Sequence, residues 1–388
     1  MTPHPSPETT AQSASRPASL RVGVVGVLSA RIRYGSALAS LPSAAITVII
    51  DPDVRLARSW ARQLGAKPEI FPSFSEFLAS EAELDAMLLP IPMLLRQGHI
   101  RGCAERGIPM LCEAPFGYSL KANEATTQFA ADHNALLFPT FPRRFDPYHN
   151  EVGRLLESNL VGALRQVRCE WGIPLDEAAV LENGVDDVDE DLLVQNLLCQ
   201  SVDLARTWFG EAYTVSADVT PLRPENRNEK ARKRTEEGIA TLIVSHEKIQ
   251  VTHTVARTRS SYPSERYTFT GAQGQLEFIA RAGVHYSSAN APALYHHSHG
   301  QTEVLPIDTL FPDMTEERAF SLLTHFLGCV RGQETPHLTP ADVRTAMDTV
   351  HAAYISTLEN SKVVLPLHRA PDFETFFRRF ETTRQLTS

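Results

Sequence analysis

The sequence is poor in cysteine and tryptophan, with five and three of them among 388 residues. It also lacks any stretch of about 18 consecutive apolar residues, the length that a membrane-spanning helix needs. The cysteines are odd in number and form no Cys-x-x-Cys pair, so they offer neither a disulfide framework nor a zinc motif. We expect them to be small buried side chains in a reducing compartment, and the protein to be cytoplasmic. They are Cys103, Cys112, Cys169, Cys199 and Cys329.

An excess of positive charge is also missing. The chain has 37 Lys and Arg against 46 Asp and Glu, which gives a formal net charge of −9. A nucleic acid or an anionic membrane would require a basic surface, so neither is expected as a partner. The basic run at 223–234 is interleaved with acidic residues, and we interpret it as a solvated loop.

The length of the chain is sufficient for two hydrophobic cores. Residues 1–19 are rich in Pro, Ser and Thr and contain no apolar block, which predicts a disordered tail rather than a signal peptide. The remaining pattern predicts a first domain over 20–142, a second domain over 143–367 and a C-terminal tail over 368–388.

The first domain alternates β-branched apolar runs with segments of helical period. Runs at 20–28, 44–51, 84–92 and 108–115 are typical of buried parallel strands. Strands that alternate with helices build right-handed βαβ units, so we predict a Rossmann-like parallel sheet. In the second domain, strand-like segments follow one another with short turns, and two helical segments lie near the C-terminus. This part predicts an α/β domain with an open, mostly antiparallel sheet.

The first predicted strand leads into a glycine pattern of the kind that binds dinucleotides. A Rossmann cofactor site needs glycines after this strand and an acidic residue about 20 residues later for the ribose. Gly26 and Asp51 fit these positions, but the second and third glycine positions hold Leu28 and Arg31. Leu28 places a side chain where the pyrophosphate would approach, whereas Arg31 and Arg33 could supply positive charge to it. Alternatively, Asp51 only caps the following helix.

Several segments together resemble the glucose-fructose oxidoreductase, inositol dehydrogenase and rhizopine catabolism family, Gfo/Idh/MocA. The segments are "VGVVG", "IIDPD", "PIP", "LCEAPFGYSL", "RRFDPYHNEVGRLLESNLVGALRQVRCEW", "TGAQGQLEF" and "TPADVRTAMDTVHAAYISTLENSKVVLP", and they extend over about residues 20–367. The resemblance implies an N-terminal Rossmann domain and a C-terminal domain whose open sheet often forms the oligomer interface. The implied substrate is a small molecule, commonly a sugar or polyol, that lies between the nicotinamide and that sheet.

The resemblance also implies a set of site residues. Those implied for the cofactor are Gly26, Leu28, Ser29, Asp51, Pro90 and Glu113, and those implied for the substrate are Arg143, Asn196 and Gln200. Because Asp51 would repel a 2′-phosphate, the expected cofactor is NAD rather than NADP. Leu28 leads us to expect that its binding is weak or lost.

The residues with which this family moves protons are replaced. The lysine of its Glu-Lys-Pro motif falls on Ala114, and its aspartate and histidine, four residues apart on a helix, fall on Asn196 and Gln200. None of these side chains can accept a proton at neutral pH, although the two amides can hydrogen-bond hydroxyl groups. If catalysis persists, Tyr118 and His149 are the candidate proton carriers. The alternative is that both of them pack or cap.

No metal site is expected from the sequence. His296, His297 and His299 stand in a predicted loop, with a spacing unsuited to a metal ion. The acidic residues at 183–191 match a calcium loop only loosely, and we predict a solvated loop there.

Two functions remain open at this point. One is an oxidoreductase of this family that acts on a sugar-like or cyclic small molecule with noncanonical catalytic groups. The other is a catalytically inactive pseudoenzyme that serves as a binding or scaffolding subunit. The expected assembly is a homo-oligomer, or a hetero-oligomer with an active paralogue. The joint loss of lysine, aspartate, histidine and the second glycine argues against the usual dehydrogenase chemistry, and fold alone does not decide function.

Overall fold

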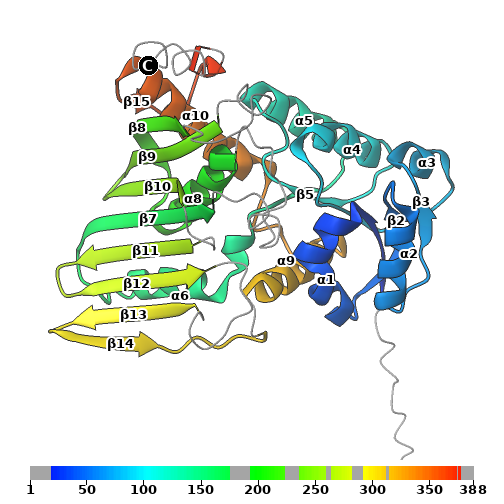
Figure 1. Cartoon of the computed structure of the whole chain (residues 1–388), viewed down its shortest axis with the longest axis horizontal. Helices are drawn as coiled ribbons and strands as arrows, with labels where there is room; N and C mark the ends of the chain where they lie inside the picture. Colours follow the sequence, from blue (N-terminus) through cyan, green and yellow to red (C-terminus); the bar gives the residue numbers. More distant parts are fainter. Residues whose placement is uncertain are drawn as a thin grey trace, which may run out of the picture.

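The structure, a computed structural model, describes residues 19–174, 193–222, 236–258, 264–281, 292–311, 314–373 and 375–376. Its helices and strands form two β-sheets with helices packed beside them, so the predicted α/β fold class is confirmed (Figure 1). Residues 1–18 of the predicted tail lie outside the described residues, and so do the predicted loops at 183–191 and 223–234.

The first sheet has six parallel strands in the order β3-β2-β1-β4-β5-β6. This is the order of a Rossmann sheet, and it reverses between β1 and β4. The strands are β1 (Leu20–Val25), β2 (Ala44–Ile50), β3 (Glu69–Phe71), β4 (Ala86–Leu89), β5 (Met110–Glu113) and β6 (Leu137–Thr140). The connecting helices are α1 (Val27–Ser40), α2 (Val54–Gln63), α3 (Phe74–Ala79), α4 (Met93–Glu105) and α5 (Leu120–Asp132), and a short 3-10 helix, η1 (Pro142–Phe145), follows β6.

Two features of this sheet differ from the sequence prediction. The apolar run at 20–28 extends past the strand: β1 ends at Val25, Gly26 turns the chain with a φ of +78° at the predicted end of the strand, and α1 begins at Val27. This backbone conformation favours glycine. Strand β3 and helix α3 are missing from the prediction. Strand β3 has three residues at the sheet edge and buries none of them fully, so its apolar signal is short.

The second sheet has nine strands in the order β14-β13-β12-β11-β7-β10-β9-β8-β15. Among the described strands, every ladder is antiparallel except the one between β7 and β10, so the predicted mostly antiparallel sheet is confirmed. The strands are β7 (Leu164–Pro174), β8 (Ala212–Leu222), β9 (Glu236–His246), β10 (Gln250–Thr258), β11 (Ser264–Gly271), β12 (Gln275–Arg281), β13 (Ala293–Ser298), β14 (Gln301–Leu305) and β15 (Val363–Val364).

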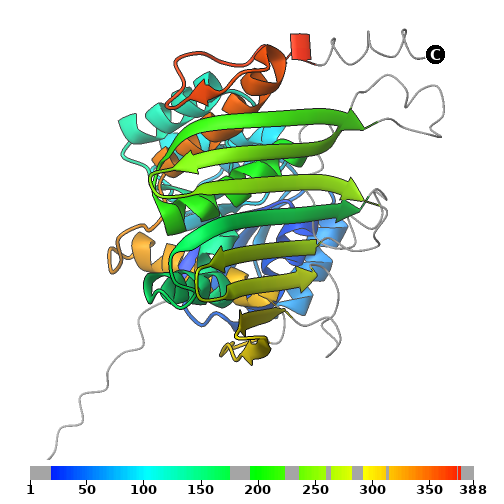
Figure 2. The same ribbon diagram turned by 90° about the vertical axis from the view of Figure 1, so that its left-hand side faces the viewer.

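Helices cover one face of the second sheet. Helices α8 (Leu193–Phe209) and α10 (Pro340–Glu359) pack on it, α6 (Pro147–Glu157) packs on α8, and α9 (Met314–Val330) packs on α1 of the first sheet. The opposite face, turned toward the viewer in Figure 2, carries no helix of the described residues. Strand β9 alternates accordingly: Leu242 is buried, whereas its neighbour Ile243 is 43% exposed.

The three histidines of the predicted loop lie in a hairpin instead. His296 and His297 belong to β13, and His299 turns the chain into β14 with a φ of +52°. The loop prediction was wrong because polar and half-buried side chains on outer strands do not give the apolar alternation by which strands are recognised. Within the described part of the chain, these histidines join no group of three metal-ligating side chains.

All five cysteines are free and buried, as predicted.

The hydrophobic core extends to the C-terminal end of the described residues. Phe376 is buried and packs against Tyr354 of α10 with ring centroids 5.0 Å apart, beyond the predicted end of the second domain at 367. None of the helices that the structure describes has the length and apolar character needed to cross a membrane.

The turn between β11 and β12 depends on the absence of a side chain at Gly271. A Cβ there would lie 2.2 Å from the backbone oxygen of Val161, which cannot rotate away. We predict that Gly271→Ala lowers the free energy of unfolding by about 1–3 kcal/mol, as measured by urea denaturation. Gly98→Ala in α4 is the matched control, since a Cβ there meets nothing within 4 Å and alanine favours the helix. Equal destabilisation by both changes would contradict the steric explanation.

Candidate functional site

The residues predicted to hold the cofactor lie where the parallel strands end. Gly26 follows β1, Asp51 follows β2, Pro90 follows β4 and Glu113 ends β5. The carboxyl ends of parallel strands meet at one edge of a sheet, and dinucleotides bind at this edge where the strand order reverses. The structure therefore brings these four residues to the edge that the fold uses for a dinucleotide.

The side chain of Asp51 forms a hydrogen bond with the beginning of α1. Its carboxylate accepts hydrogen bonds from the amide of Val27 at 2.7 Å and from the amide of Asp53 at 2.8 Å. The first of these amides is one that a helix N-terminus offers to anions, including phosphates. Asp51 does not cap the following helix, because Asp53 caps α2 by accepting from the amides of Arg55 and Leu56.

Apolar side chains stand at the helix ends where a pyrophosphate would lie. Leu28 in the first turn of α1 is 58% exposed, and Ser29 beside it is half-buried. Leu94 and Leu95 in the first turn of α4 are 78% and 47% exposed. Because β1 and β4 are neighbours, the two helix ends belong to the same part of the edge. Leucine side chains cannot hydrogen-bond phosphate oxygens, so this edge suits a pyrophosphate less well than a glycine-rich loop does.

Glu113 belongs to a buried polar network between α1, β5 and β6. Its carboxylate accepts hydrogen bonds from Tyr34 Oη and Thr140 Oγ1, both at 2.8 Å, and Arg33 Nη1 lies 3.4 Å away. Burial opposes the ionisation of Glu113, but the charges of Arg33 and Arg96 outweigh it and hold the pKa of this carboxyl below its usual range. The charge of Arg33 is therefore balanced by Glu113 inside the first domain.

The loop after β5 carries no lysine. Ala114 is 7% exposed, and its peptide bond to Pro115 is cis. The buried guanidinium of Arg96 donates to the carbonyl oxygens of Pro115 at 2.7 Å and of Ile91 at 2.9 Å, and so connects this loop to the end of β4. Tyr118 lies in the same loop and is half-buried.

Arg143 of η1 joins the two sheets. Its guanidinium forms a bidentate pair with Glu265 of β11, in which Nε and Oε2 are 3.1 Å apart. It also donates to Oε1 of Gln200 in α8 and lies over the ring of Trp171 in β7, 4.0 Å from the centroid. Two predicted substrate residues, Arg143 and Gln200, are thus in direct contact. Asn196 lies one turn earlier in α8, outside the residues whose side chains the structure describes.

This cluster is electrostatically strong because it is buried. Burial opposes the ionisation of Glu265, but Arg143 and Arg318 lower its pKa to about 2. The bond to Arg143 also orients Gln200: its oxygen faces the guanidinium, and its two N–H donors have no hydrogen-bond partner among the residues that the structure describes.

His149 of α6 lies beside the same cluster and is only 1% exposed. Its Nδ1 is 3.3 Å from Asp146 Oδ2, and its Nε2 is 3.9 Å from Glu265 Oε2. Burial disfavours the charge of Asp146, but Arg318 and His149 outweigh it and hold the pKa of this carboxyl far below its usual range. A histidine so enclosed does not reach a substrate directly, which favours the packing alternative for His149.

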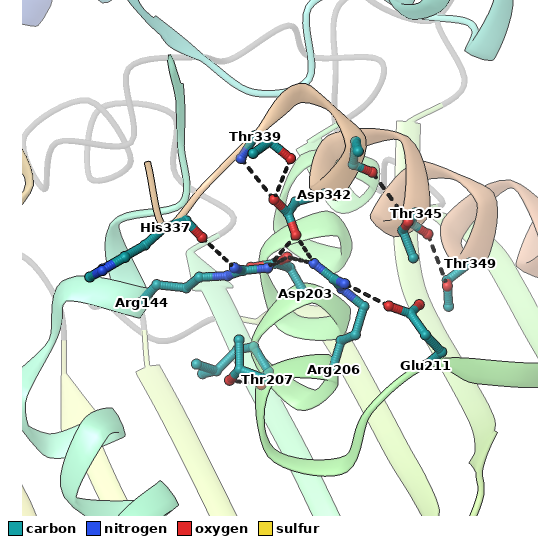
Figure 3. A network of polar contacts seen from close by, with 12 residues as sticks. Arg144, Asp203, Arg206, Thr207, Glu211, His337, Thr339, Asp342, Thr345 and Thr349 are labelled. Carbon is teal, nitrogen blue, oxygen red and sulfur yellow. Dashed lines mark hydrogen bonds and ion pairs between the residues drawn. The ribbon is translucent and has the colours of Figure 1, made fainter. Parts of the chain in front are cut away.

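Arg144 forms a second bridge from η1 to α8 (Figure 3). Its guanidinium pairs with Asp203 through N–O distances of 2.5 and 2.7 Å and lies 3.2 Å from Asp342. Arg206 pairs with the same Asp342 and with Glu211. This network fixes α8 to the beginning of α10.

Sequence reasoning missed three residues of the Arg143 cluster: Trp171, Glu265 and Arg318. A signal for Glu265 was present, because its side chain lies on the same buried face of β11 as those of Tyr267 and Phe269. A charged residue on an inward face needs a partner. Its partner Arg143 is 122 residues away, a separation at which spacing carries no information.

Comparison with known proteins agrees with the Rossmann strand order of the first sheet. Residues 20–141 match the Gfo/Idh/MocA family model, described as an oxidoreductase family with an NAD-binding Rossmann fold. Over 180 residues the chain is 31% identical to D-xylose 1-dehydrogenase (NADP(+)) 2 of Haloferax volcanii, which covers 45% of this chain and 53% of that protein. Over 155 residues it is 31% identical to inositol 2-dehydrogenase of Corynebacterium glutamicum, which covers 39% of this chain and 44% of that protein. Residues 20–141 thus carry the NAD-binding Rossmann fold of the Gfo/Idh/MocA oxidoreductase family.

These alignments span about half the length of the two curated relatives. A longer correspondence is seen with the structure of an oxidoreductase from Agrobacterium radiobacter in complex with NAD+, L-tartaric acid and magnesium. Its TM-score is 0.72 at 17% identity, and the match covers 89% of this chain and 98% of the other. At this identity, the likeness shows a shared fold alone, over nearly the whole length of both chains.

Glu265 makes the stability of this protein depend on pH. Its pKa of about 2 lies below the ordinary value of 4.5, so its ionised form adds stability above about pH 4.5, and this contribution is lost as the pH falls toward 2. We predict that Glu265→Gln lowers the free energy of unfolding at pH 7 by about 3–5 kcal/mol, because the buried Arg143 loses its carboxylate. The free energy of unfolding of the variant should also decrease less than that of the wild type as the pH falls from 4.5 to 2.

Urea denaturation at a series of pH values measures both effects. Glu303→Gln, on the exposed outer strand β14, is the matched control and should keep the wild-type profile. If both variants gave the same pH profile, Glu265 would not be the group responsible.

Proposed function

We propose that this protein binds a sugar-like or cyclic small molecule in a substrate cleft beside Arg143 and Gln200, as an oxidoreductase-type protein that lacks the usual proton-transfer groups of the Gfo/Idh/MocA family. The observation that carries the proposal is the contact between Arg143 and Gln200 where η1 meets α8. The free N–H donors of Gln200 suit a hydroxyl group. Relatives named as D-xylose and inositol dehydrogenases support a polyol as the substrate class.

The proposed cofactor is a nicotinamide dinucleotide, NAD in preference to NADP. The Rossmann strand order, the turn at Gly26 and the place of Asp51 after β2 support it, as does the NAD-binding description of the family. Asp51 would accept from a ribose hydroxyl and repel a 2′-phosphate. When bound, the nicotinamide supplies the hydride chemistry. The exposed Leu28 and the bond between Asp51 and Val27 lead us to propose weak binding.

The proposed loss of standard catalysis rests on three replaced positions and on the enclosure of His149. Ala114, Asn196 and Gln200 stand where the resemblance puts the lysine, aspartate and histidine of the family. Oxidation of an alcohol needs a base that takes the hydroxyl proton, and neither an amide nor a methyl group can do this. His149 is enclosed between carboxylates. Among the candidates named from the sequence, the half-buried Tyr118 is then the remaining proton carrier.

A second candidate function is that of an inactive subunit that assembles with other chains. The uncovered face of the second sheet supports it, because Ile239 and Ile243 of β9 are 42% and 43% exposed there. Exposed aliphatic side chains in the middle of a sheet are typical of association surfaces. The partner would be a second copy of this chain or an active paralogue.

Leu28 should decide the affinity for the dinucleotide. We predict that NADH binds wild-type protein with a dissociation constant well above about 1 μM in calorimetry, and that Leu28→Gly lowers it at least about tenfold, or 1.4 kcal/mol. The glycine frees the approach to the amides at the beginning of α1. Val304→Gly, an exposed change on β14, should have no effect. A submicromolar constant for the wild type would contradict this prediction.

Turnover should require the restoration of several groups together. We predict that wild-type protein forms no NADH from D-xylose or myo-inositol, and that the triple variant Ala114→Lys, Asn196→Asp, Gln200→His does, because groups that act as a unit are not additive. The matched control replaces Ala114 by Met, which has similar length and no basic group. The rate should differ between the two by about 10²- to 10⁴-fold, the usual contribution of general-base catalysis. Robust wild-type turnover that Tyr118→Phe abolishes would contradict this prediction and identify the proton carrier.

A further inference from the structure

A cavity of about 340 Å³ lies behind the Arg144 bridge, between α6, α8 and α9. Gln200 and Leu204 are one turn apart on α8, and the first contacts Arg143 whereas the second lines the cavity. Arg144 lines this cavity, whereas its neighbour Arg143 contacts Gln200 at the proposed substrate cleft and is not part of the lining. Its volume lies within the range of small-molecule sites, about 300–1,000 Å³.

One wall of the cavity is aromatic. It is formed by Trp208 of α8 and Phe145 of η1. Trp208 Nε1 donates to the backbone oxygen of His149 at 3.3 Å, and its ring lies at an interplanar angle of 27° to the imidazole. These contacts hold the indole in a fixed orientation. A flat aromatic wall accommodates the C–H face of a saturated ring.

The charged groups of the lining already have partners. Arg144 pairs with Asp203 and Asp342. The carboxylate of Glu317 accepts hydrogen bonds from the amides of Leu310 and Phe311 at 2.7 and 2.8 Å. Because both signs of charge are balanced within the protein, the lining favours a neutral ligand over an anion or a cation.

Uncharged polar groups complete the lining. Asn150 and His337 are exposed at the rim, and Ser321 of α9 is half-buried. His149 also lines the cavity but is enclosed between Asp146 and Glu265, so the polar groups available to a ligand are those of Asn150, His337 and Ser321. Amide, hydroxyl and imidazole groups around an aromatic wall can bind the hydroxyls around a sugar ring.

We propose that this cavity is a second binding site, for one neutral monosaccharide or cyclic polyol, with the ring of the ligand against Trp208 and its hydroxyls toward Asn150 and Ser321. The site goes beyond the proposed function, since it lies outside the cleft and does not depend on NAD(H) or on turnover.

Tryptophan fluorescence of the full chain, with D-glucose, D-xylose and myo-inositol as probes, tests the proposal. Of the three tryptophans, Trp60 and Trp171 are buried and Trp208 is half-buried, so a ligand in the cavity covers Trp208. At least one probe should shift the emission to shorter wavelength with saturation, and Trp208→Phe should abolish the shift. No saturable change with any probe would overturn the proposal.

Two substitutions on α9 locate the ligand. Ser321→Leu fills the cavity and should weaken binding at least tenfold in calorimetry, whereas Thr324→Leu on the exposed side of the same helix should leave it unchanged. Asn150→Leu at the rim is a second variant that should weaken binding of the ligand. Circular dichroism verifies the fold of each variant. Unchanged affinity in both Ser321→Leu and Asn150→Leu would place the ligand elsewhere and overturn the proposal.

Two further controls separate this site from the cleft and define its ligand. Gln200→Leu alters the cleft, so the fluorescence shift should persist in it. Loss of the shift in Gln200→Leu but not in Ser321→Leu would assign the ligand to the cleft, and thus overturn the second site while supporting the proposed function. D-Glucuronate should bind more weakly than D-glucose. Binding of the anion alone would overturn the neutral class.

Discussion

The buried ion pair between Arg143 and Glu265 connects the two sheets of this protein. Arg143 follows the last strand of the parallel sheet, and Glu265 lies within the antiparallel one. Their side chains are 13% and 4% exposed, so each charge is tolerated only because the other is present. Arg318 and Asp146 form a second such pair beside them. Two cations and two carboxylates thus fix η1 against β11, α6 and α9.

This constraint sets the geometry of the cleft. Gln200 of α8 is held by the same guanidinium that binds Glu265. The next residue of η1, Arg144, makes a second connection to α8 through its ion pair with Asp203. Helix α8 is therefore held against η1, which follows the last strand of the parallel sheet. Polar groups held in this way can bind hydroxyls, whereas catalysis additionally needs a group that changes protonation state. We propose that the cleft meets the first requirement with the Gln200 amide and the Arg143 guanidinium and does not meet the second.

The sequence was informative where one local pattern determines the structure. Buried β-branched runs predicted the parallel sheet, and strand-like segments joined by short turns predicted the antiparallel sheet. The turn at Gly26 and the place of Asp51 followed from the spacing of glycine and acid. Long-range contacts were beyond such reasoning: nothing local indicates that Glu265 meets Arg143, or that Asp51 bonds to Val27 rather than capping α2. Short or polar strands such as β3 and β13 lack the apolar alternation that identifies a strand.

Transfer of deuterium from substrate to cofactor tests most directly whether the cleft lacks dehydrogenase chemistry. Wild-type protein is incubated with NAD+ and carbon-deuterated myo-inositol or D-xylose, and the nicotinamide pool is analysed by mass spectrometry. If the proton-transfer groups are lost, deuterium in NADH stays at the level of a protein-free control. Incorporation that grows with protein concentration and saturates with the polyol would contradict the proposed loss of catalysis.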